Sequence, residues 1–468
     1  MTTPPVHAVD LEPSLIAERT YTTRRRRALV DVPVVLSFTI ALLFVLPEGL
    51  ILPNLPLVGR PGLIVAMLLF SWWALARLNP WLVVVGPQPL RWLVLAYMIA
   101  FMLSYLAGTM RGLTSLEQNG QDTAVLSACA FIGILLMAAD GIPNWERLRG
   151  VLRVFVWCAG FMAIVGLLQG VLKIDVTRYL LIPGLQLKGE LAGLENRGAN
   201  QFRVAGTALH FIEFSAVMAM TVPYAIHLAR FSASRLHRRL AAAVALLAAA
   251  AVPMSISRTG VIALAVAILV MLPAWGWRLR YNIMAMAVGM LGVLMVVRPG
   301  LVGTIRSMFT SAGSDPSITG RTERYGLIGH WFGQRPWLGR GPFSVVPGVN
   351  GGIVFDNQWL YTLVTQGIVG AAALAALHIG GITLATIAYR RSQEAEVRHL
   401  CVALISTQLI AILSEGTYDA FYFTTYSSVL ALLLGVSGAV WRFTHPARTV
   451  RTSAVRRSSA ELAPAAPG

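Results

Sequence analysis

Residues 356–388 read DNQWLYTLVTQGIVGAAALAALHIGGITLATIA, a polar start that runs directly into a long apolar stretch. A helix that crosses a membrane needs roughly 20 mostly apolar residues, and the stretch 357–388 exceeds that length. The preceding segment, 298–356, is polar and rich in arginine. This part of the sequence therefore predicts a membrane-spanning helix that follows a large basic loop.

The composition of the whole chain is that of a polytopic membrane protein. Of its 468 residues, 56% are hydrophobic and only 13% are charged, whereas soluble domains carry about twice that share of charge. The net charge of +17 comes almost wholly from arginine, because Lys173 and Lys188 are the only lysines. No soluble module with a basic face is visible, so we do not expect nucleic-acid binding.

We predict an all-α fold, a polytopic transmembrane helix bundle of about 12 spans, because about that many apolar runs are long enough to cross a bilayer. The runs are 28–47, 61–79, 90–108, 121–140, 151–173, 204–230, 239–254, 257–274, 281–298, 357–388, 399–415 and 421–441.

The arginines predict how the bundle is oriented. Membrane proteins keep Lys and Arg in cytoplasmic loops, and an arginine run at 24–27 precedes the first span. Alternate short loops after it are rich in arginine, which predicts a multi-pass protein of the cytoplasmic (inner) membrane with both termini cytoplasmic. The expected parts are a disordered cytoplasmic tail at 1–27, a membrane domain at 28–441 with extracytoplasmic loops at 174–203 and 299–356, and a disordered cytoplasmic tail at 442–468.

The larger extracytoplasmic loop has a helical pattern of its own. In residues 322–334, the side chains of Tyr325, Ile328, Trp331 and Phe332 fall on one side. This pattern is typical of a short amphipathic helix that lies across a membrane surface.

Three ionisable residues lie at the outer mouth of the run 204–230. Helical spacing predicts that His210 and Glu213 share one face, with Arg203 above them on the same side. Ionisable residues within a membrane span are costly and are therefore functional candidates. The alternative is a buried His–Glu pair that only fixes helix packing.

Further arginines lie where other loops enter the membrane. Arg258 begins a helix after a serine-rich turn, where backbone N–H groups favour anions, although an ordinary helix cap explains the same pattern. Arg321 and Arg324 lie in the large loop. Because arginine binds phosphate oxygens in a bidentate fashion, Arg203, Arg258 and Arg321 converging from different spans would form a clamp for a diphosphate.

Asp356 and Asn357 lie where the large loop re-enters the membrane. A carboxylate at this point could accept a proton from the hydroxyl group of an acceptor. The alternative is a cap for the following helix, and both roles can hold at once. The chain has no metal-binding or phosphate-loop motif, so we expect no metal and no nucleotide cofactor.

Together these motifs resemble the superfamily of O-antigen ligases and O-antigen polymerases. The likeness covers roughly residues 150–440, and Asp356 stands where the ligases have a histidine. The matching segments are RVAGT at 203–207, SRTG at 257–260, GR at 320–321, PWLGRG at 336–341, and Asp356-Asn357 followed after nine residues by GIVG at 367–370.

The resemblance implies a GT-C-like membrane glycosyltransferase that acts without metal on a polyprenyl-diphosphate-linked glycan donor. Its acceptor would be a glycan or a lipid-linked glycan. Asp356, Arg321 and Arg203 would be catalytic, whereas Arg258, Arg324, Asn357, His210 and Glu213 would bind substrate.

The aspartate in place of histidine favours polymerisation of exopolysaccharide repeats or of another cell-wall glycan over transfer to a lipid A core. It also predicts a rate profile without a step near pH ~6.5, the ordinary histidine range. The alternatives are a transporter or flippase of lipid-linked sugars, and a polymerase of the peptidoglycan type.

Overall fold

The computed structural model describes residues 31–55, 58–78, 86–188, 194–196, 202–310, 316–346 and 352–446, without the side chains of 194–196, 308 and 316–324. In this described part, nine helices are long and apolar enough to cross a membrane, and three shorter apolar helices accompany them. The chain is thus an all-α polytopic membrane protein, as predicted. Each of the predicted apolar runs overlaps one of these helices.

The long apolar helices are α4 (Pro89–Thr109), α5 (Ser115–Gly141), α6 (Trp145–Leu172), α7 (Phe211–Phe231), α8 (Arg235–Met254), α10 (Trp277–Val297), α13 (Gln358–Arg391), α14 (Ala395–Glu415) and α15 (Thr424–Phe443). The shorter apolar helices are α2 (Val32–Val45), α3 (Pro61–Ala76) and α9 (Arg258–Met271). The connections contain α11 (Leu301–Thr310), α12 (Pro316–Gln334), the 3-10 helices η3 (Val176–Leu180), η4 (Leu272–Ala274) and η6 (Ala420–Tyr422), and the strands β1 (Leu50–Ile51), β2 (Gln186–Leu187), β3 (Leu194–Asn196) and β4 (Phe202–Val204).

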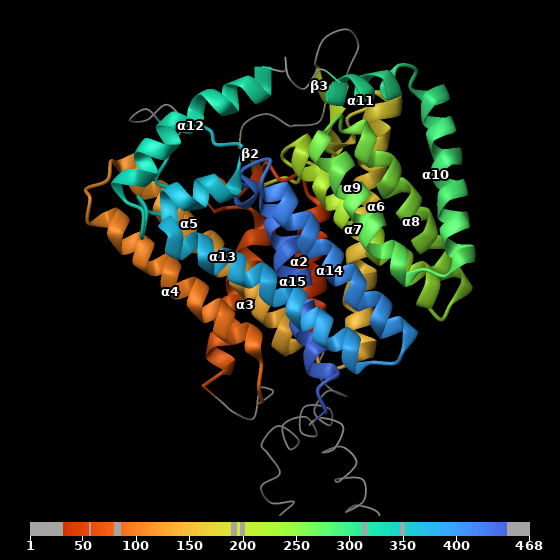
Figure 1. Cartoon of the computed structure of the whole chain (residues 1–468), viewed down its shortest axis with the longest axis horizontal. Helices are drawn as coiled ribbons and strands as arrows, with labels where there is room; N and C mark the ends of the chain where they lie inside the picture. The colour runs from red at the N-terminus through yellow and green to blue at the C-terminus, as the bar shows by residue number, and fades with distance from the viewer. Residues whose placement is uncertain are drawn as a thin grey trace, which may run out of the picture.

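The helices pack as a bundle whose centre and edge differ in burial. Helices α7 and α15 are almost wholly buried, whereas α10 is exposed along nearly its whole length (Figure 1). Its exposed side chains include Val288 and Val296. A helix that is apolar all round is suited to lipid rather than to water, so the exposed face of α10 fits the edge of a membrane domain.

Helices α11 and α12 and the antiparallel hairpin β3–β4 lie together at one end of the bundle, which we call the loop end (Figure 1). The first and last described residues lie near the opposite end, which we call the terminal end. There Arg147 forms an ion pair with Asp31, and Arg442 donates a hydrogen bond to the carbonyl oxygen of Ile142.

Helix α13 is broken at Gly367, which has a φ of 69° and a ψ of −170°. The turn 336–341 fills the break. The N–H of Ile368 donates to the Pro336 carbonyl oxygen at 2.8 Å, and the N–H of Gly341 donates to the Thr365 carbonyl oxygen at 2.8 Å. Backbone groups at membrane depth must find partners within the protein, and this turn supplies them.

The break requires glycine, because a Cβ atom at Gly367 would lie 2.2 Å from the Trp337 carbonyl oxygen. Gly367→Ala is therefore expected to lower the free energy of unfolding by about 3 kcal/mol, through the positive φ and the displaced turn. The measurement is unfolding of the purified protein in detergent. The matched control is Gly289→Ala on α10, where the added methyl group meets open space; equal stability of the two variants would contradict this reading of the break.

Candidate functional site

Arg203 lies in strand β4 at the loop end, not on a helix. The run 204–230 was predicted as a helix, but α7 begins only at Phe211. The prediction was wrong at this end because Gly206 adopts a φ of 60° and the turn is fastened to its neighbours. The N–H of Gly206 donates to Gln169 Oε1 at 2.8 Å, and the Thr207 hydroxyl donates to the Phe44 carbonyl oxygen at 2.6 Å.

One contact holds the Arg203 guanidinium, and another holds the strand that carries it. Its central carbon lies 4.1 Å from the centre of the Phe211 ring, a cation–π contact. The neighbouring residue, Phe202, accepts a hydrogen bond on its carbonyl oxygen from Arg298 Nη2 at 2.5 Å. Arg298, at the end of α10, thereby ties the strand that carries Arg203 to the bundle.

His210 caps α7 and is held as a neutral imidazole. Its Nδ1 accepts the N–H of Ile212 at 3.3 Å, so the proton of the neutral ring is on Nε2. Burial and the charge of Arg203 together lower the pKa of His210 to about 4, against the opposing charge of Asp356. Arg203 and Asp356 thus both lie close enough to His210 for their charges to act on it.

Glu213 does not pair with His210. It is fully buried and accepts the N–H groups of Tyr426 at 3.0 Å and Leu209 at 3.1 Å. Its carboxyl group is also hydrogen-bonded to that of Glu48, which requires one proton between the two. The predicted shared face with His210 was wrong, because His210 precedes the helix. Glu213 instead pins the starts of α7 and α15 together beneath the site.

Glu48 is a residue that the sequence analysis missed. It accepts hydrogen bonds from Arg60 Nη1 at 2.6 Å and from the Thr424 N–H at 2.7 Å. Burial opposes ionisation, but the Arg60 guanidinium and these hydrogen bonds hold the pKa of Glu48 below its usual range. The sequence feature that could have indicated it is the pair of Glu48 and Arg60 in the short loop between the first two apolar runs.

Asp356 adopts a φ of 52°, the left-handed region, and Asn357 caps α13. Asn357 Oδ1 accepts the N–H of Leu360 at 3.1 Å, and its Nδ2 donates to the Gly416 carbonyl oxygen at 3.1 Å. The capping role considered for this pair therefore falls to Asn357. The carboxylate of Asp356 is not used as that cap.

Asp419 holds the backbone of both residues and was also missed by sequence reasoning. Its Oδ2 accepts the N–H of Asp356 at 3.3 Å, and its Oδ1 accepts the N–H of Asn357 at 3.0 Å. Burial, together with the charge of Asp356, raises the pKa of Asp419 to about 6 against the pull of these hydrogen bonds. Asp419 is the only carboxylate between α14 and α15. An isolated carboxylate in so short and apolar a loop could have identified it as a candidate.

The start of α9 contacts the loop 416–423, which joins α14 to α15 and contains Asp419. Ser257 Oγ caps α9 by accepting the N–H of Gly260 at 3.4 Å. The Thr259 hydroxyl donates to the Thr417 hydroxyl at 2.8 Å. Arg258, beside Thr259, therefore lies next to the loop that holds Asp356 through Asp419. The helix cap considered as the alternative for this turn is present, and an anion-binding role for Arg258 stays a prediction.

The side chains of Arg321 and Arg324 lie outside the part of the chain that the structure describes, although both residues belong to α12. The helix predicted at 322–334 is confirmed by α12. Ile328 and Trp331 are buried against Phe355 and Tyr361, whereas Tyr325 is exposed. The apolar face of α12 thus packs on the segment that leads into Asp356.

At the loop end, the structure brings together Arg203, His210 and Asp356, with Asn357 and Asp419 beside Asp356 and Arg258 on the neighbouring helix start. A sequence comparison finds that residues 243–375 match a protein family described as O-antigen ligase. This range includes Arg258, Arg321, Arg324, Asp356 and Asn357. No curated protein matches the chain. The resemblance carried by the motifs is therefore confirmed over residues 243–375, where the chain is similar to the O-antigen ligases.

Proposed function

We propose that this protein is an integral-membrane glycosyltransferase that transfers or polymerises glycan from a polyprenyl-diphosphate-linked donor. The loop end would face the outer side of the cytoplasmic membrane. The observation that carries this proposal is a chain of contacts at the loop end. The Phe211 ring lies 4.1 Å from the Arg203 guanidinium carbon and 4.0 Å from the His210 ring. The His210 ring lies 5.7 Å from Phe423, in the loop whose Asp419 accepts the N–H of Asp356. The family match over residues 243–375 supports glycosyl transfer as the class of reaction.

Arg203, helped by Arg258, would bind the donor diphosphate. Two guanidinium groups offset the charge of a diphosphate and stabilise it as a leaving group, which is the largest contribution expected from such a site. Arg321 and Arg324, on the helix above, would add to this charge. His210, with its proton on Nε2, can donate a hydrogen bond to the same anion or to the sugar.

Asp356 would act on the acceptor. A hydroxyl oxygen of the acceptor attacks the anomeric carbon of the donor, and its proton passes to the carboxylate of Asp356. The bond between the anomeric carbon and the phosphate oxygen breaks, and the diphosphate leaves with the electron pair. Attack opposite the leaving group inverts the anomeric carbon. Asn357, fixed as the cap of α13, would orient the acceptor.

The test is turnover by the purified protein, incubated with a polyprenyl-diphosphate oligosaccharide in detergent or liposomes. Growth of the glycan chain with release of the diphosphate carrier would support the enzyme. Movement of the intact lipid across the liposome membrane without chain growth would support the transporter instead.

The pH dependence of transfer is expected to show a limb near pH 6, because Asp419, which holds the backbone of Asp356, takes up a proton there. This limb belongs to Asp419, so the expectation of a rate profile without a histidine step near pH ~6.5 stays a prediction. Below pH 6 the rate should fall, because a protonated Asp419 accepts the N–H groups of Asp356 and Asn357 less strongly and holds Asp356 less firmly.

The raised pKa of Asp419 affects the stability of the fold in the opposite direction to its effect on the rate. The folded state binds this proton more tightly than the unfolded chain, so the group stabilises the fold at low pH and this contribution is lost as the pH rises through about 6. Protonation of Asp419 therefore does not itself destabilise the fold in this range. Rates measured from pH 5 to 8 should lose the limb in Asp419→Asn; a limb that persists in that variant would assign it to another group.

A further inference from the structure

Two buried carboxyl groups lie behind the candidate site, and the proposed reaction uses neither of them. Glu48 comes from the loop between α2 and α3, and Glu213 comes from the first turn of α7. Both side chains are buried. Their carboxyl groups are hydrogen-bonded to each other, so together they hold one proton. We call these two residues the carboxyl pair.

The two members of the carboxyl pair have different surroundings. Glu48 accepts hydrogen bonds from Arg60 Nη1 at 2.6 Å and from the Thr424 N–H at 2.7 Å. Besides Glu48, Glu213 has two backbone N–H groups as partners in the described part of the chain. A guanidinium that bonds to a carboxylate stabilises its charged form. The negative charge of the pair therefore rests on Glu48, and the proton rests on Glu213.

The carboxyl pair holds the backbone on both sides of one contact in the site. Leu209, just before His210, donates its N–H to both carboxyl groups, at 3.3 Å to Glu48 and at 3.1 Å to Glu213. The N–H that Glu48 accepts at 2.7 Å belongs to the residue just after Phe423. The rings of His210 and Phe423 lie 5.7 Å apart. The pair thus fastens the turn that ends at His210 to the end of the loop 416–423.

We propose that the carboxyl pair positions the two sides of the site, with its charge on Glu48 and its proton on Glu213. This rests on the proposed function, because the turn at His210 lies on the side that would bind the donor, and the loop 416–423 holds Asp356. A misplacement of about 1 Å between reacting groups lowers a rate by on the order of 10²-fold. Glu48 and Glu213 are therefore positioning residues that contact neither donor nor acceptor.

Two glutamine variants of the full-length protein test which member carries the charge, in the turnover assay with a polyprenyl-diphosphate oligosaccharide. Glu48→Gln removes the charge that faces Arg60, whereas Glu213→Gln keeps an N–H donor toward Glu48 and a carbonyl oxygen for the Tyr426 N–H. We expect Glu48→Gln to lower kcat by about 10²-fold and Glu213→Gln by less than about tenfold. The KM for the donor should stay within about threefold in both, because no donor contact is lost. Equal kcat in the two variants would overturn the assignment. If Glu48→Gln does not fold, Glu213→Gln decides alone, since a loss of about 10²-fold there would overturn it as well.

The second measurement is the rate at which diethyl pyrocarbonate modifies His210, followed by mass spectrometry, and it does not depend on turnover. His330 on α12 is exposed, whereas His210 is half-buried, so His330 serves as the reference within each protein. We expect Glu48→Gln to raise the rate at His210 relative to His330 by on the order of threefold or more, because the turn before α7 is loosened. Glu213→Gln should stay closer to the wild type, because its hydrogen bonds are kept.

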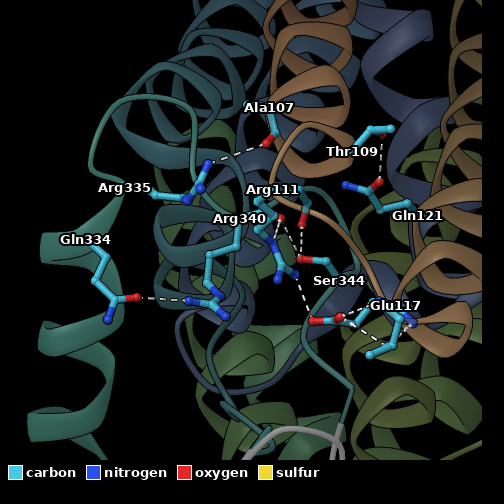
Figure 2. A network of polar contacts seen from close by, with 11 residues as sticks. Ala107, Thr109, Arg111, Glu117, Gln121, Gln334, Arg335, Arg340 and Ser344 are labelled. Atoms are coloured by element: carbon cyan, nitrogen blue, oxygen red, sulfur yellow. Dashed lines mark hydrogen bonds and ion pairs between the residues drawn. The ribbon is translucent and has the colours of Figure 1, made fainter.

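Glu117→Gln is the matched control for this reactivity. Glu117 is also a buried carboxylate at the loop end, and it accepts a hydrogen bond from Arg111 Nη2 at 2.8 Å (Figure 2). The other donors to its carboxylate within the described residues belong to Thr114, so His210 should react as in the wild type. If His210 reacts no faster in Glu48→Gln than in this control, the inference is overturned. Absence of chain growth in the wild type would instead count against the proposed function, because the reactivity of His210 still tests the carboxyl pair.

Discussion

Asp356→Asn is expected to lower the rate of glycan transfer by about 10²- to 10⁴-fold, the range over which a positioned proton acceptor contributes. Asparagine keeps the size of the side chain and tolerates the left-handed backbone that Asp356 adopts. The N–H of residue 356 can still donate to Asp419. The substitution thus removes the proton acceptor with little disturbance of the fold.

The measurement is the initial rate of chain growth with purified protein at saturating donor, beside donor binding in the same preparation. Binding should stay within about twofold of the wild type, because no cation is lost and one negative charge is removed. Asp122→Asn is the control, since it neutralises an exposed carboxylate near the start of α5. A rate above a tenth of the wild type in Asp356→Asn would show that another group takes the proton.

Arg203→Gln is expected to lower kcat/KM for the donor by about 10²- to 10³-fold, because a group that stabilises developing charge on the leaving diphosphate is removed. Glutamine is uncharged and cannot form the bidentate contact of a guanidinium. Arg203→Lys keeps the charge without the planar fork, so it should recover only part of the loss.

The matched control is Arg178→Gln, in the same extended connection between α6 and α7. Its side chain is 76% exposed, and its nearest carboxylate oxygen, on Asp175, lies 3.9 Å away. This variant should transfer glycan at the wild-type rate. If Arg203→Gln and Arg178→Gln behave alike while both fold, Arg203 has no part in binding the donor.

The bundle could be predicted from the sequence because lipid imposes a simple requirement on length and polarity. Each apolar run became a helix, and the pattern at 322–334 became part of α12. The break in α13 could not be predicted from length and polarity. An apolar run has the same composition whether its helix is continuous or broken, and Gly367 is explained only by the turn from 336–341 that inserts beside it.

The members of the candidate site that could be proposed from the sequence, among them Arg203, Arg258 and Asp356, lie at the ends of apolar runs. It was not predictable where two distant segments meet. Asp419 lies about sixty residues from the backbone groups that it holds, and no periodicity links such positions. The prediction that His210 and Glu213 share a helical face was wrong for a local reason. The residues before Phe211 are apolar, but they form a turn around Gly206 and not a helix.

The central claim is that the loop end binds a diphosphate between arginines beside Asp356. Its most direct test is an experimental structure of the Asp356→Asn variant with a polyprenyl-diphosphate oligosaccharide bound. The account predicts phosphate oxygens in hydrogen-bonding contact with the guanidinium groups of Arg203 and Arg258, and the anomeric carbon beside residue 356. A donor bound at the terminal end, or one whose phosphates contact neither arginine, would contradict it.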